Sequence, residues 1–225
     1  MGIESFSEIG NKESFTDKTY LSIKPNDSLS NIEIQGFINS ELSDAKDFEL
    51  FDDDEFLLSV FDCCEEDINI EVAFSDSLED ALKMFNPKNW QDITDSEKLG
   101  QIKALVNEIS DDLGISDIPT LQFYDGKDEY GIYNYEDNSI SLNRLYFDDP
   151  VELVDTIAHE LRHAYQHYRY KLNETIDDAK YSFNFENYIS PIETGSGYLF
   201  FNDYYNQFVE VDARAYANVF REALT

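Results

Sequence analysis

The sequence predicts an α+β fold, and the order of its helical and extended patterns supports that class. Four segments have the apolar spacing of amphipathic helices, namely 75–85, 94–113, 150–168 and 202–217. Three short runs have the composition and alternation of strands, namely 120–124, 131–135 and 139–143. The strands are grouped together with helices before and after them, which is typical of an α+β domain.

The composition of the chain changes near residue 70. Residues 41–67 are very acidic, including DDDE at 52–55, but aromatic and aliphatic residues are interleaved throughout. A purely solvated acidic tail would not carry so many apolar side chains, so this segment is expected to dock on something. We predict an acidic N-terminal extension or small subdomain at 1–70 and a folded domain at 71–225. The extension could cover the cleft of that domain, bind a separate partner, or form a subdomain with its own contacts.

Local signals mark the ends of the first helices and the turn of the hairpin. The first helix should end before Pro87, because proline cannot continue a helix. Thr94 and Glu97 form a capping box that begins the second helix, which should stop at Gly114. The last two strands should form a hairpin around the turn at 136–138.

The long helix after the hairpin has an equally clear start. Asp149 can serve as the N-cap, Pro150 fits the first helical position, and Glu152 completes an arrangement like a capping box. An apolar stripe follows at helical spacing, formed by Leu153, Ile157, Leu161, Ala164 and Tyr168. All three histidines of the protein lie on this helix, so the candidate chemistry of the chain is concentrated in one element.

Residues 159–163 have the order H-E-x-x-H. His159 and His163 are four residues apart, so they project from one face of the helix and can reach one metal ion. Glu160 lies beside them, where a carboxylate could accept a proton from a metal-bound water. This arrangement is typical of zinc hydrolases, whose catalytic zinc takes three protein ligands and one water.

His167 is a poor candidate for the third ligand. It lies eight residues beyond His159, which is about 12 Å of helical rise and too far for one ion on a straight helix. Metalloproteases that take a third histidine from beyond the helix need the pattern H-E-x-x-H-x-x-G-x-x-H. In this chain Gln166 replaces the glycine and Arg169 replaces the histidine. We therefore expect His167 to lie at the surface or behind the ligands.

The helix near the C-terminus offers a better third ligand. Glu210, Ala213 and Ala217 share one face, and small residues beside a ligand let two helices approach closely. Glu210 is preferred over Asp212 for this role. The alternative is a solvated salt bridge between Glu210 and Arg214, which is four residues further along the helix.

The pair of motifs HELRHA and EVDARAYA resembles the gluzincin type of zincin metallopeptidase, especially the ImmA/IrrE-like families and related bacterial, phage and polymorphic-toxin domains. In these families H-E-x-x-H on one helix is followed by E-x-x-A-x-x-[FY]-A on another. Residues 130–143 also resemble the hairpin and edge strand that precede the metal helix, and the likeness covers about 86–225. It implies a zincin-like minimal core with the metal ligands His159, His163 and Glu210 and the catalytic base Glu160.

The expected activity is zinc-dependent hydrolysis of peptide bonds with one Zn²⁺ ion. Glu160 would take a proton from a zinc-bound water, and the metal would assist the attack of that water on the carbonyl. Glu160 would then pass the proton to the leaving amine. The strand around Ile140–Asn143 is expected at the sheet edge, where an extended peptide could pair with it. A further donor would stabilise the oxyanion, and four tyrosines are candidates: Tyr198, Tyr204, Tyr205 and Tyr216.

The formal net charge of −32 limits the partners of the protein. Such a charge repels nucleic-acid phosphates and anionic membranes but attracts basic proteins and peptides. The sequence shows no secretory signal or membrane-spanning stretch, and its only cysteines are the adjacent Cys63 and Cys64. These features predict a cytoplasmic protein, although delivery into another cell by dedicated secretion machinery would leave no such signal. Two other functions remain open: a toxin or effector protease with one target, and a non-catalytic metal-binding regulator acting through its acidic surface.

Overall fold

The computed structural model describes residues 68, 70–126, 129–172, 174–190, 192–194 and 197–225. The predicted extension at 1–70 therefore lies almost entirely outside the described residues, as do Cys63 and Cys64. Within the described part, no helix combines the length and the apolar character needed to cross a bilayer.

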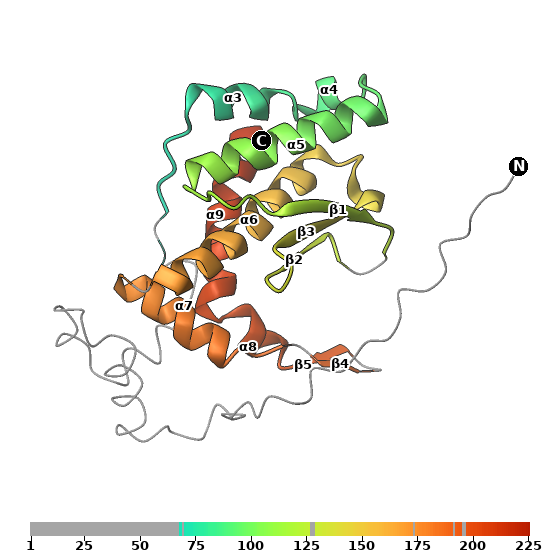
Figure 1. The fold of residues 1–225 in the computed structure, drawn as a ribbon. Helices are drawn as coiled ribbons and strands as arrows, with labels where there is room; N and C mark the ends of the chain where they lie inside the picture. Colours follow the sequence, from blue (N-terminus) through green and yellow to red (C-terminus); the bar gives the residue numbers. More distant parts are fainter. Residues whose placement is uncertain (1–67, 69, 127–128, 173, 191, 195–196) are drawn as a thin grey trace, which may run out of the picture.

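The structure confirms the α+β class (Figure 1). Its elements before the long helix are α3 (Asp76–Lys83), α4 (Pro87–Trp90), α5 (Asp95–Asp112), β1 (Thr120–Tyr124), β2 (Gly131–Asn134) and β3 (Ser139–Asn143). The later elements are α6 (Pro150–Leu172), α7 (Ile176–Glu186), β4 (Ile192–Thr194), β5 (Gly197–Leu199), α8 (Phe201–Tyr205) and α9 (Phe208–Leu224). A small mixed sheet is thus followed by long helices.

The helix starts follow the predicted capping chemistry at Thr94, Glu97 and Asp149, whereas Glu152 pairs with Arg221 and does not complete a capping box. Thr94 and Glu97 form both hydrogen bonds of a capping box at the start of α5. Asp149 accepts hydrogen bonds from the backbone N–H groups of Val151 and Glu152, which are otherwise without partners in the first turn of α6. These local interactions orient α6 at the point where it leaves the sheet.

The three-stranded sheet has the order β1–β3–β2, with β1 parallel and β2 antiparallel to β3. The hairpin was correctly predicted, but the placement of Ile140–Asn143 at the sheet edge was wrong. Those residues belong to β3, the central strand, and the edge nearest α6 is β2. Side-chain alternation does not reveal which backbone edge is free, because it reports only the two faces of a strand. Because β1 pairs with β3 on the side away from β2, β3 is the central strand and β2 is an edge strand.

Helix α6 is the central element of the fold. It packs most extensively on α9 and also contacts α5, α7, β2 and β3. Figure 1 shows it passing between the sheet and α9. Its fully buried residues Val154, Ile157 and Leu161 join a core with Tyr216 and Phe220 of α9. Burial of this apolar stripe holds the helix that carries all three histidines in one orientation.

The segment between α6 and α9 contains more structure than the sequence indicated. Helix α7, with a capping box at Thr175, is not among the four helices predicted from the sequence. The predicted helix at 202–217 is divided into α8 and α9 at Asn206 and Gln207. Gln207 is fully buried, and its side chain bonds the backbone of Ile189 and Tyr204. These bonds hold the chain between the two helices, and Gln207 is the N-cap residue of α9 by position, without a side-chain capping hydrogen bond.

Gly131 allows β2 to approach α6 closely. A Cβ atom on Gly131 would lie 2.6 Å from Cγ2 of Thr156 and 3.3 Å from Cγ of Glu160, both on α6. Gly100, in α5, is different because its Cβ would meet no atom within 4 Å. Comparing alanine substitutions at the two positions therefore separates the cost of a steric clash from the general effect of replacing glycine.

We expect Gly131→Ala to lower the free energy of unfolding by about 1–3 kcal/mol, because the added methyl group overpacks the contact between β2 and α6. Gly100→Ala is the matched control and should raise it by roughly 0.5–1 kcal/mol, because alanine is the better helix former. Urea unfolding of both variants measures the difference. A Gly131→Ala variant as stable as the wild type would show that β2 can move without cost.

Candidate metal centre

Three predicted ligands converge in the structure. His159 and His163 of α6 and Glu210 of α9 each direct one possible ligand atom to the same place, and these atoms all lie within 4.8 Å of one another. The two Nε2 atoms are 3.0 Å apart, and each lies 3.7 Å from Oε2 of Glu210. Packing of α6 against α9 brings together residues separated by about 50 positions in the chain.

These distances suit one metal ion. Ligand atoms about 2.0–2.1 Å from a tetrahedral metal lie about 3.3 Å from one another, and the observed separations fall on either side of that value. Glu210 is 3% exposed, whereas His159 and His163 are partly accessible. The site is therefore closed on the side of α9 and open on the side of the histidines.

Gln166 determines which nitrogen of His163 faces the other ligands. Its amide nitrogen Nε2 donates to the carbonyl of Val209 and to Oδ2 of Asp212, at 2.8 and 2.7 Å. Its oxygen Oε1 must then face Nδ1 of His163, at 2.8 Å, and accept the proton from it. In the neutral ring this leaves a lone pair on Nε2, directed toward His159 and Glu210. Gln166 therefore holds His163 in the tautomer whose Nε2 lone pair can bind a metal.

Tyr188 leaves one oxygen of Glu210 for a metal. Its hydroxyl donates a 2.6 Å hydrogen bond to Oε1, while Oε2 faces the two histidines. Burial acts to raise the pKa of Glu210, but interactions with His163 and His159 and the Tyr188 hydrogen bond outweigh it and lower the pKa to about 2. Glu210 also lies in the first turn of α9, where the helix dipole favours a negative charge.

Asp212, the weaker sequence candidate, is engaged elsewhere. It is buried and forms a bidentate ion pair with Arg162, with N–O distances of 2.8 and 2.7 Å. It also accepts hydrogen bonds from Gln166 and from the hydroxyl of Tyr181, which is on α7. The solvated pair considered between Glu210 and Arg214 does not fit a carboxylate that is 3% exposed. Arg214 instead donates to the backbone of Tyr205 and lies over its ring.

Glu160 is buried between α6 and the edge strand. Its Oε2 accepts a 2.7 Å hydrogen bond from the backbone N–H of Tyr133 in β2. Burial, reinforced by the negative charge of Glu210, raises the pKa of Glu160 to about 7, although His163 and the Tyr133 N–H act in the opposite direction. Within the described residues, Oε1 of Glu160 has no hydrogen-bond donor.

His167 lies outside the metal cluster, as the spacing predicted. It is half-buried among aromatic rings and lies 3.4 Å from the hydroxyl of Tyr133, a contact made through Nδ1. Burial, together with the charge of Lys171, lowers the pKa of its imidazole. The ring therefore packs against Tyr133 of β2 and does not face Glu210.

The four tyrosines named as oxyanion donors occupy different places. The ring of Tyr204 lies 6.2 Å from that of Tyr188, measured between centroids, and burial and the charge of Glu210 raise the pKa of its phenol. Tyr216 is buried near Arg162, and Tyr205 lies under Arg214. The side chain of Tyr198 lies outside the described residues. Sequence reasoning missed Tyr188 and Gln166. Only Gln166 had a usable signal, since it lies three residues from His163 on the same helix.

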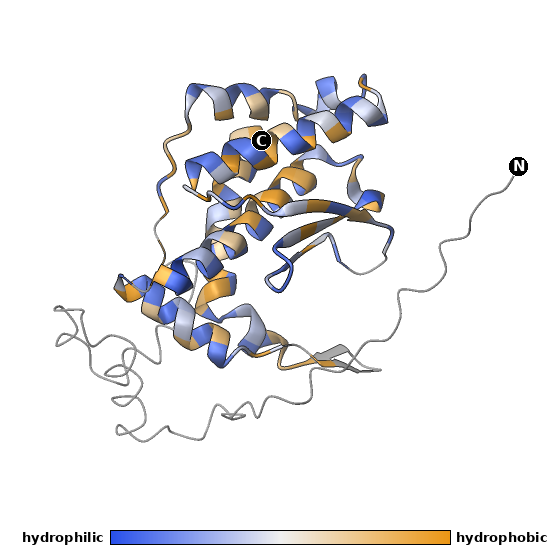
Figure 2. Cartoon of the chain, viewed as in Figure 1, coloured by the Kyte–Doolittle hydropathy of each residue, from blue (hydrophilic) through white to orange (hydrophobic). Residues whose placement is uncertain are grey.

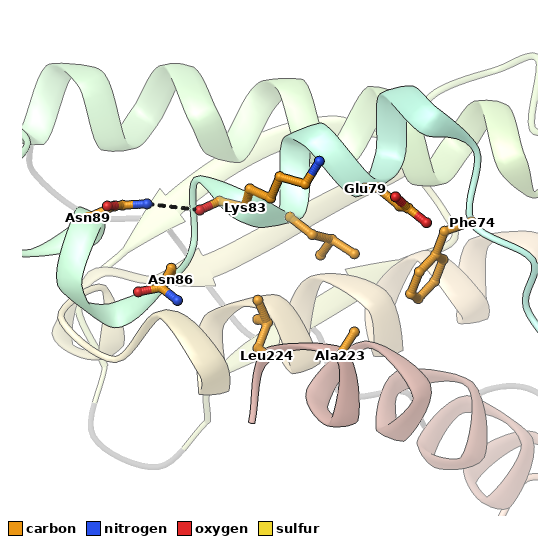
Figure 3. A pocket seen from close by; sticks show the side chains of 8 residues that line it. Phe74, Glu79, Lys83, Asn86, Asn89, Ala223 and Leu224 are labelled. Carbon is orange, nitrogen blue, oxygen red and sulfur yellow. Dashed lines mark hydrogen bonds between the residues drawn. The ribbon is translucent and has the colours of Figure 1, made fainter.

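A hollow of about 460 Å³ lies far from these residues. Figure 3 shows it between α3 and the C-terminal end of α9, with Glu79 and Lys83 on one side and Ala223 and Leu224 on the other. Thirteen residues separate Ala223 from Glu210 on α9, which corresponds to about 20 Å of helix. This hollow is therefore separate from the candidate metal centre.

Elemental analysis should find one metal ion per wild-type chain after zinc is supplied. We expect His163→Ala and Glu210→Ala to lose it, because each removes one of three converging ligands. His167→Ala is the matched control, since it removes a histidine from the same helix outside the cluster, and it should retain the metal. A folded wild type that binds no zinc, or equal loss in the control, would contradict the site.

Gln166→Leu should lower zinc affinity about 10- to 100-fold, because His163 loses the partner that orients its ring. The substitution also removes a donor from the Val209 carbonyl and from Asp212, so the folded fraction is measured alongside by circular dichroism. Competition with a zinc chelator measures the affinity. A folded variant with wild-type affinity would show that the helix alone orients His163.

Comparison of the chain with protein-family models, with curated proteins and with solved structures gave no match. His159, His163 and Glu210 form a group that could hold one metal ion, and the function of the protein is inferred from this group.

Proposed function

We propose that the protein is a zinc-dependent metallopeptidase. The observation that carries this proposal is the convergence of His159, His163 and Glu210, with Glu160 next to the first histidine in sequence. Two imidazoles and one carboxylate form a ligand set known for catalytic zinc, and three protein ligands leave one position for water. The resemblance of both helix motifs to gluzincins supports the same assignment.

When bound, zinc supplies a Lewis acid that lowers the pKa of water to about 7 and polarises a carbonyl group. His159, His163 and Glu210 would hold the ion. Glu160 would accept the proton of the attacking water and pass it to the leaving amine. Burial favours its protonated form, and the positive charge of the ion would favour the carboxylate, so Glu160 can exchange a proton near neutral pH.

The chain itself would position Glu160 for this step. The hydrogen bond from Tyr133 holds Oε2 against β2, and Oε1 is left to meet the water. Tyr188 would keep Oε1 of Glu210 away from the metal and so favour coordination through one oxygen. Tyr204, beside Glu210, is the candidate among the four tyrosines for stabilising the developing oxyanion.

An extended peptide would pair with β2, the edge strand beside α6, through outward backbone groups other than the Tyr133 N–H, which already donates to Glu160. Tyr133 directs its N–H away from β3 to Glu160, so the same side of β2 faces the proposed catalytic base. A peptide on this edge would pass beside Glu160. The net charge of −32 favours a basic peptide or protein as substrate.

Glu160→Gln should retain zinc but lose peptide hydrolysis, by at least about 100-fold, because the amide cannot accept the proton. The measurement combines zinc content with the cleavage of a mixture of peptides by mass spectrometry. Tyr168→Phe, which changes a half-exposed residue of the same helix, should leave both values unchanged. A zinc-bound Glu160→Gln protein that cleaves at the wild-type rate would remove Glu160 from the mechanism.

A further inference from the structure

Five large apolar side chains are exposed in one short stretch beside the metal centre. We call them the apolar platform: Ile192, Leu199, Phe200, Phe201 and Tyr205. Their exposed fractions range from 40% for Tyr205 to 54% for Leu199. Figure 2 shows the apolar colouring of β5 and the start of α8, and Figure 1 places these elements at one end of the molecule. Exposed apolar residues gathered in this way mark interaction surfaces in soluble proteins.

The platform is built by specific local geometry. Ile192 of β4 pairs directly with Leu199 of β5, so these two side chains lie on the same face of the hairpin. The rings of Phe201 and Tyr205 stack with centroids 5.9 Å apart. Phe200, which joins β5 to α8, has a left-handed backbone with φ of 60°, which is unfavourable for a residue with a Cβ atom.

Aromatic contacts connect the platform to the metal ligands. Phe201 lies 6.1 Å from Tyr204, and Tyr204 lies 6.2 Å from Tyr188, measured between ring centroids. Tyr188 in turn donates its hydroxyl proton to Glu210. Two aromatic rings therefore connect the platform to Glu210, and an extended polypeptide lying on the platform can continue toward the candidate metal centre.

We infer that the apolar platform binds the substrate of the proposed peptidase, and that this substrate is a basic polypeptide with a bulky apolar side chain near the cleaved bond. The inference rests on the proposed function. Continuity of the platform with Glu210 supplies the position, and burial of a leucine- or phenylalanine-sized side chain supplies binding energy. The chain charge of −32 selects a basic segment as the occupant.

The same charge argues against two other occupants. A second copy of the chain would bring two bodies of charge −32 together, which costs electrostatic free energy. An anionic membrane surface would be repelled for the same reason. A basic polypeptide gains from both the charge and the apolar surface.

Binding can be measured separately from cleavage with the full chain carrying Glu160→Gln and loaded with zinc. The probes are three labelled peptides of equal length: one alternating lysine with phenylalanine and leucine, one with serine in place of the apolar residues, and one with glutamate in place of lysine. We expect the first to bind at least about tenfold more tightly than either of the others.

The variant that tests the platform is Leu199→Ser with Phe201→Ser. Its matched control is Ile118→Ser with Leu145→Ser, which removes two exposed apolar side chains from elsewhere on the surface. The first pair should weaken binding of the lysine, phenylalanine and leucine peptide by about tenfold or more, and the control should leave it unchanged. Circular dichroism checks that both variants are folded.

Equal binding by the two double variants would overturn the inference. So would platform-dependent binding to phosphatidylcholine vesicles, or platform-dependent dimers in sedimentation, since these would assign the surface to a membrane or a second copy. Cleavage is scored separately on a peptide mixture. A wild type that binds the peptide but cleaves nothing refutes the proposed activity alone, whereas cleavage indifferent to the platform variant refutes this inference alone.

Discussion

The candidate site depends on the buried ion pair between Arg162 of α6 and Asp212 of α9. Burying two charges is costly, and the cost is offset here by bidentate geometry and by further hydrogen bonds from Gln166 and Tyr181. The pair fixes the two helices relative to each other both along and around their axes. Glu210 lies two residues before Asp212, so the same docking places its carboxylate opposite the histidines. Apolar packing alone would permit more sliding between the helices.

The interior therefore contains a connected polar layer beside an apolar one. His163 bonds Gln166, Gln166 bonds Asp212, and Asp212 bonds Arg162. Each polar group in this chain of contacts has a partner, which is the condition for burying it without a large penalty. One consequence is that the tautomer of a histidine on α6 is linked to the position of α9.

The two buried carboxylates of the site have opposite electrostatic surroundings. Glu210 meets two imidazoles and a phenol, which lower its pKa to about 2. Glu160 is buried with fewer compensating donors and near Glu210, so its pKa rises to about 7. Such a separation is typical of sites in which two carboxylates have different roles. The backbone of β2 acts against this separation, because the hydrogen bond from the Tyr133 N–H lowers the pKa of Glu160.

The sequence by itself determined most of the elements up to α6 and the two motifs that carry the candidate ligands. Capping residues such as Thr94 and Asp149 act within a few positions of the chain, and the four-residue spacing of His159 and His163 places them on one face of any helix. Only the tertiary structure decided which strand is at the edge, where α8 ends, and which side chains support the ligands. Gln207, Tyr188 and Asp212 act through contacts with distant segments, and neither periodicity nor spacing reports such contacts.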